Sequence, residues 1–69
     1  MNNLEKAYVL LEITYIKNFD NTNIFPNNWY NIKDYSLKIK ILNEALKKNL
    51  LIIETEMYNN FINNHSCNI

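Results

Sequence analysis

Few residues of this 69-residue chain have the chemistry of an active site. His65 and Cys67 are its only histidine and its only cysteine. A zinc site needs about four ligands at fixed spacing, and two ligands near one end of the chain cannot complete it. A Cys–His nucleophile needs a third group that orients the base, and the sequence shows none. We therefore expect no catalytic residue, no metal, no cofactor and no enzymatic activity.

The middle of the chain is rich in lysine. Four side chains there are candidates for contact with a nucleic-acid backbone: Lys38, Lys40, Lys47 and Lys48. Specific reading of bases commonly relies on arginine, which the chain lacks. A helix-turn-helix also needs a short, tight turn between two helices, and none is evident. A dimeric DNA-binding transcriptional regulator that uses this basic segment is therefore the alternative function, and we expect nucleic acid not to be the main partner.

Three aromatic residues, Phe25, Trp29 and Tyr30, lie close together between asparagines. Trp and Tyr are over-represented among the residues that dominate binding energy at interfaces, and binding residues are often on loops. These three are our candidate partner-binding residues. Large aromatic rings with a polar tip also suit the edge of a core. The sequence leaves both interpretations of Trp29 and Tyr30 open.

The segment with the clearest start and end is residues 34–48. Asp34 can accept hydrogen bonds from the free N–H groups of a first helical turn, and Asn49 can adopt the left-handed conformation that ends a helix. Apolar and polar side chains fall on opposite arcs at 100° per residue, which predicts an amphipathic helix. Residues 36–41 also alternate strictly between polar and apolar, so a half-buried strand is the competing interpretation for them.

Residues 3–17 are predicted to form the first helix, capped by Asn3. One apolar stripe at helical spacing holds Leu4, Ala7, Tyr8, Leu11 and Tyr15. A second stripe holds Val9, Ile13 and Ile16, and Leu10 lies apart from both. A helix that is apolar on more than one side is either central in its domain or shared with a partner. A homodimer through this helix is therefore an expectation.

The segments that connect and follow these helices are less regular. Residues 18–33 are expected to be an irregular, aromatic-rich connection, with a turn at 20–23 and a short helical turn from Pro26 to about Ile32. Residues 50–53 are apolar and fit either a short strand or a helical turn. The last helix is predicted to end near residue 63, either continuous from residue 50 or starting after an N-cap at Thr55. Residues 64–69 are expected to be a frayed tail.

Length and composition define the overall class. A 69-residue chain makes one small domain over 1–69, and we predict an all-α fold of three helices. A domain of this size buries only about 60% of its unfolded surface, so its stability is marginal without disulfides, metals or self-association. The chain contains no glycine, which excludes a glycine-rich phosphate loop. We find no signal-peptide pattern and no apolar run long enough to span a membrane, and we expect a cytoplasmic protein.

Together these observations favour a small protein that acts by contact rather than by catalysis. Its size leaves little room for a substrate pocket, whereas its surface suffices for a standard interface. The abundance of Asn, Ile and Lys is typical of AT-rich genomes, such as those of low-GC bacteria and their phages. Small inhibitors, anti-defence proteins and immunity proteins are common there. We therefore expect a protein–protein interaction module that covers a site on a larger protein.

Overall fold

The structure is a computed structural model, which describes residues 2–19 and 24–66. Over these ranges it is all-α, with three helices and no strand: α1 (Asn3–Phe19), α2 (Tyr35–Lys48) and α3 (Glu56–Ser66). Two short 3-10 turns, η1 (Trp29–Asn31) and η2 (Ile52–Glu54), precede α2 and α3. The predicted fold class is confirmed. The predicted turn at 20–23 and residues 67–69 of the predicted tail lie outside the described residues.

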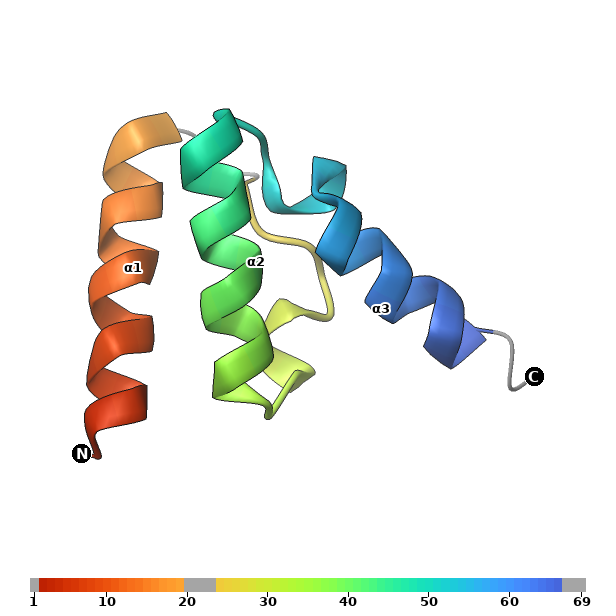
Figure 1. Cartoon of the computed structure of the whole chain (residues 1–69), viewed down its shortest axis with the longest axis horizontal. Helices are drawn as coiled ribbons and strands as arrows, with labels where there is room; N and C mark the ends of the chain where they lie inside the picture. The colour runs from red at the N-terminus through yellow and green to blue at the C-terminus, as the bar shows by residue number, and fades with distance from the viewer. Residues whose placement is uncertain (1, 20–23, 67–69) are drawn as a thin grey trace.

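Helix α2 lies between the other two helices (Figure 1). In the described part of the chain, α1 and α3 each pack on α2 and do not contact one another. The segment before α2 carries η1 and brings its aromatic residues against α1 and α2. None of the described helices is both long and apolar enough to cross a membrane.

Helix α1 begins one residue earlier than its predicted cap implied. Asn2, and not Asn3, is the N-cap: its side-chain oxygen accepts a hydrogen bond from the N–H of Glu5 at 2.7 Å. Its backbone oxygen accepts the first helical bond, from the N–H of Lys6. The helix also runs to Phe19, two residues beyond the predicted end. Phe19 continues the buried face because its ring lies 4.9 Å from that of Tyr15.

Helix α2 has the two caps that the sequence predicted. The Asp34 carboxylate accepts from the N–H of Leu37 at 3.1 Å, and Asn49 adopts φ 56° and ψ 48°. The N–H of Leu50 then donates to the carbonyl of Ala45 at 2.8 Å, which together with the bond from Asn49 to Leu46 forms a Schellman motif. Asparagine therefore takes the place of the usual glycine. The strand alternative for residues 36–41 is wrong, since the helix runs through them without interruption.

The chain between α2 and α3 is neither a strand nor a continuous helix. Leu51 and Thr55 both have extended backbone, with ψ of 156° and 146°, and the 3-10 turn η2 lies between them. Glu54 stabilises this turn by accepting from the N–H of Leu51 at 2.8 Å. Thr55 then caps α3 as predicted, because its hydroxyl accepts from the N–H of Tyr58. Helix α3 continues to Ser66, so residues 64–66, predicted as tail, are helical.

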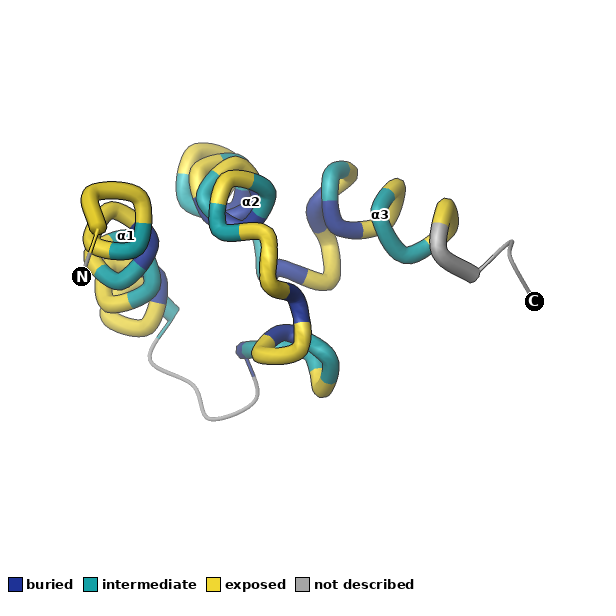
Figure 2. The backbone as a smooth tube through the Cα atoms, turned by 90° about the horizontal axis from the view of Figure 1, so that it is seen from below, coloured by how far each residue is buried: buried dark blue, intermediate teal, exposed yellow. Residues whose placement is uncertain are grey.

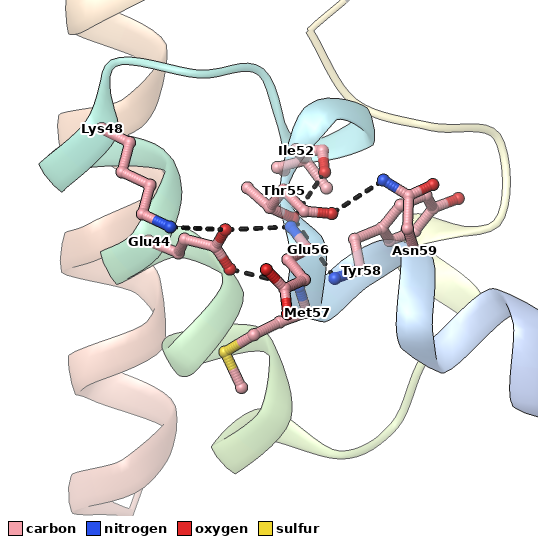
Figure 3. Close-up of polar contacts among 8 residues, drawn as sticks. All are labelled: Glu44, Lys48, Ile52, Thr55, Glu56, Met57, Tyr58 and Asn59. Carbon is pink, nitrogen blue, oxygen red and sulfur yellow. Dashed lines mark hydrogen bonds and ion pairs between the residues drawn. The ribbon is translucent and has the colours of Figure 1, made fainter.

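A carboxylate from α2 attaches α3 to the rest of the fold. The two oxygens of Glu44 accept from the N–H groups of Glu56 and Met57 at 2.9 and 3.1 Å, and Lys48 lies 3.6 Å away (Figure 3). A negative charge at this position also interacts favourably with the dipole of α3. Partial burial acts to raise the pKa of Glu44, but these N–H donors and Lys48 outweigh it and hold the pKa below its usual value.

The core lies along the inner side of α2. Its members are apolar or aromatic side chains from all five helices and turns and from the chain on either side of η1: Tyr8, Tyr15, Ile24, Trp29, Ile32, Ile41, Leu42, Ala45, Ile52 and Tyr58. Tyr8, Tyr15 and Tyr58 are buried, and Tyr35 is half-buried against Tyr8.

One buried hydroxyl joins three separate parts of this core. The hydroxyl of Tyr15 donates to the carbonyl of Ile24 at 2.6 Å and accepts from the N–H of Ile52 at 3.0 Å. Ile24 lies in non-helical chain and Ile52 is the first residue of η2, so neither group has a hydrogen-bond partner within a helix or turn. Tyr15 thus links α1 to the connection before η1 and to the start of η2.

We expect Tyr15→Phe to be far more damaging than removal of one oxygen suggests. It would leave a buried carbonyl and a buried N–H without partners, at a cost of about 2–4 kcal/mol in the free energy of unfolding. Tyr58→Phe is the matched control, because it removes one part-buried bond to Asn28 and should cost about 1 kcal/mol. Urea denaturation of both variants measures the difference. Equal destabilisation would contradict the role of Tyr15.

We expect Glu44→Gln to lower stability by about 1 kcal/mol at neutral pH, because it removes a charged cap. Since the folded pKa of Glu44 is lowered, its contribution is full above the ordinary value of 4.5 and disappears as pH falls below it. Denaturation from pH 7 to 3 should therefore show a smaller loss for the variant than for the natural chain. Glu5→Gln, in the first turn of α1, controls for a helix-dipole effect alone. Parallel pH profiles would contradict this assignment.

Candidate functional site

The ammonium group of Lys38 lies in a cage of four aromatic rings. Its Nζ atom is 4.9 Å from the ring centre of Tyr8, 5.1 Å from Trp29, 5.7 Å from Tyr30 and 5.8 Å from Tyr35. The residue is only 3% exposed. A cation over an aromatic face is attracted by the negative charge of the ring system, more strongly when water is excluded. The cage thus holds α1, η1 and the start of α2 around one charge.

A chain of hydrogen bonds supports the cage from the side of α1. The indole N–H of Trp29 donates to the hydroxyl of Tyr8 at 3.0 Å, and that hydroxyl donates to the carboxylate of Glu12 at 2.5 Å. Burial and the Glu12 carboxylate together raise the pKa of Tyr8. Burial lowers the pKa of Lys38, and Glu12 opposes this effect. Glu12 is therefore the negative group that balances the caged cation.

Trp29 has no exposed surface. It packs against Tyr8 and Phe25, with ring centres 6.3 and 6.0 Å away, and its one polar atom is paired. Of the two interpretations that the sequence left open for Trp29, the structure supports the core. Phe25 is half-buried between Tyr15 and Tyr30 and contributes mainly to the same aromatic packing.

Tyr30 is the member of the predicted group that reaches the surface, with 61% of it exposed. Its ring is held by Lys38 and by Phe25, whose ring centre is 5.8 Å away. Partial burial and the nearby Glu12 carboxylate raise the pKa of its hydroxyl. Tyr30 is thus an exposed aromatic side chain that contacts Lys38 and Phe25 and lies next to Glu12 of α1.

The outer side of α1 carries the second apolar stripe. Figure 2 shows that the buried positions of α1 face α2, whereas exposed positions cover the side turned away from it. Leu10, Ile13 and Ile16 lie on this side and are between 43 and 66% exposed, and Val9 is half-buried beside them. We define the interaction surface as these four side chains of α1 together with Tyr30.

The four lysines predicted for nucleic acid do not form one basic surface. Lys38 is inside the aromatic cage, and Lys48 is paired with Glu44. Lys40 and Lys47 are exposed on α2, on the side of the exposed residues Ser36 and Asn43. Only two of the four predicted cations are therefore both exposed and outside an ion pair among the described residues.

The aromatic cage was not predicted from the sequence, although the helical spacing of some of its residues was visible there. Lys38 lies four residues before Leu42 and seven before Ala45, so helical spacing places it on their buried face. Lysine is rarely buried, so this spacing alone does not predict a core position, and Lys38 was interpreted as a candidate for contact with nucleic acid. Tyr8 and Glu12 are four residues apart on one helix, a spacing at which side chains meet. Nothing local indicated that the rings of η1 would close over Lys38.

No three His, Cys, Asp or Glu side chains come together as a metal site in the part of the chain that the structure describes. Comparison with models of protein families, with curated proteins and with solved structures finds no match to this chain.

We expect Trp29→Ala to cost about 3–5 kcal/mol, because it empties the largest fully buried site and leaves the hydroxyl of Tyr8 without a donor. Trp29→Phe, which keeps a ring but loses the N–H, should cost about half as much. Tyr30→Ala is the control and should change stability by less than about 1 kcal/mol, because the side chain is largely exposed. Circular dichroism during urea unfolding measures all three. A stable Trp29→Ala protein would contradict the core position.

Proposed function

We propose that this chain is a non-enzymatic protein–protein interaction module that binds a larger protein through the interaction surface. The observation that carries the proposal is the exposure of the apolar side chains of α1 and of Tyr30, which lies beside Glu12 of the same helix. Contiguous exposed apolar groups rimmed by polar residues are characteristic of interaction sites.

Tyr30 has the properties of a binding anchor. A large aromatic side chain buries much surface for few rotatable bonds. Lys38 and Phe25 already restrict its ring in the free protein, so binding costs less conformational entropy than it would for a mobile side chain. The caged lysine therefore contributes to binding indirectly, because it positions Tyr30.

The side chains of α1 fit a hydrophobic groove. Val9, Ile13 and Ile16 recur at i, i+4 and i+7, which is the spacing of helices that place one apolar face in a groove. The whole chain has a surface of 4906 Å², and a standard interface needs about 800 Å² from each partner. Covering a functional site of a larger protein is the action that this size allows, as inhibitors and immunity-type proteins do.

The test is capture of a partner by purified variants. Tyr30→Ala should weaken binding of the captured protein about tenfold, and Ile13→Asp should abolish it, because a charge would enter an apolar groove. Ile53→Asp is the matched control, since Ile53 is 51% exposed on η2, outside the interaction surface. Pull-down from the natural host followed by calorimetry with the captured protein gives the affinities. A partner that binds all four proteins equally would contradict the proposal.

A further inference from the structure

The charges beside the apolar stripe of α1 are arranged asymmetrically. At 100° per residue, Glu5 and Glu12 fall along one edge of the stripe formed by Val9, Ile13 and Ile16. Lys6 and Lys17 fall along the opposite edge, and both are exposed. The stripe therefore has an acidic edge and a basic edge. Two copies of this surface are complementary in charge when the acidic edge of each meets the basic edge of the other.

Helix geometry decides which orientation this is. When two identical helices pair in parallel around a two-fold axis, each edge of one helix meets the opposite edge of the other. In an antiparallel pair, like edges meet. The spacing of Val9, Ile13 and Ile16 matches positions d, a and d of a heptad, which makes Glu12 a g position and Lys17 the e position five residues later. Parallel pairing thus brings Glu12 of each copy to Lys17 of the other, whereas antiparallel pairing brings acid to acid.

The two most exposed side chains of the interaction surface also match in the parallel orientation. Tyr30, 61% exposed, lies on the acidic edge beside Glu12. Leu10, 66% exposed, lies on the basic edge between Lys6 and Lys17. Opposite edges meet in the parallel pair, so Tyr30 of each copy faces the edge that carries Leu10 of the other. One arrangement therefore matches the stripe, the Glu12 and Lys17 charges and both exposed apolar residues, although it also brings the two Lys6 side chains near each other.

We propose that in the free protein the interaction surface is covered by a second copy of the same chain, through parallel two-fold pairing of α1 with α1. This inference rests on the proposed function, because the larger target would bind the same surface and displace the second copy. The contact between the two copies of the stripe covers only about two turns of helix. The buried area is therefore at the small end of the range for protein interfaces, and we expect a dissociation constant in the micromolar range.

Sedimentation equilibrium of the purified full chain tests the pairing. We expect a reversible monomer–dimer equilibrium, abolished by Ile13→Asp and unchanged by Ile53→Asp. Lys17→Glu should weaken dimerisation about threefold, because it places an acid beside Glu12, whereas Lys17→Arg should preserve it. A wild-type chain that stays monomeric up to millimolar concentration would overturn the proposal, as would a dimer that survives Ile13→Asp.

Disulfide trapping tests the orientation. In a Cys67→Ser background, Lys6→Cys places one thiol at the a position one heptad before Ile13, where the basic edge borders the apolar stripe. Parallel pairing brings the two copies of residue 6 together and should give a covalent dimer under mild oxidation. In an antiparallel pair they would be at least roughly 15 Å apart, given a rise of 1.5 Å per residue. A dimer in sedimentation that does not form this disulfide would overturn the parallel arrangement.

These measurements separate the two proposals. A monomeric chain whose Tyr30→Ala and Ile13→Asp variants still lose the captured target would overturn self-pairing and leave the proposed function intact. A dimer that no host protein displaces would support self-pairing and count against the proposed function.

Discussion

The buried hydroxyl of Tyr15 is the interaction on which the arrangement of the non-helical chain depends. In a chain this small, some connections between helices pass through the core. Two of them carry a buried backbone group, the carbonyl of Ile24 and the N–H of Ile52, that no helix satisfies. A buried carbonyl or N–H without a partner costs more than one hydrogen bond usually contributes. Because one hydroxyl serves both groups, α1 determines where the chain before η1 and the chain at η2 must lie.

The same principle explains how so many aromatic residues pack in a chain without glycine or disulfides. Tyr8, Tyr15, Trp29 and Tyr58 each carry one polar atom, and each of these atoms is paired with another group of the protein. Their rings can therefore be buried without a desolvation penalty for the polar tip. Lys38 extends this scheme to a full charge, because the rings and Glu12 replace the water that an ammonium group would otherwise require. Hydrogen bonds and the contacts of Lys38 thus pair the polar groups that lie within the apolar core.

Sequence reasoning succeeded mainly where the physical signal is local, although it placed the cap of α1 at Asn3 instead of Asn2. Asp34, Asn49 and Thr55 were recognisable as caps because each satisfies neighbouring backbone groups, and the helices followed from them. It failed at Lys38 and at residues 50–54, where contacts distant in the sequence outweigh local preference. The apolar run there has helical and strand propensity, but the bond from Ile52 to Tyr15 holds it as a 3-10 turn. Burial of Trp29 could not be deduced, because core and surface aromatics have the same local pattern.

The position of α3 at one end of the fold has a consequence for local stability. Among the helices and turns it packs on α2 and η2, Tyr58 in its first turn reaches Asn28, and its later turns extend away from the rest of the fold (Figure 1). Helix segments with few buried neighbours open in smaller, independent steps than the rest of a domain. The amides of α3 should therefore exchange with deuterium well before those of α1 and α2, through a sub-global opening in which the bonds to Glu44 break first. On this basis α1 and α2 would form the most stable unit, and α3 would open and close against it.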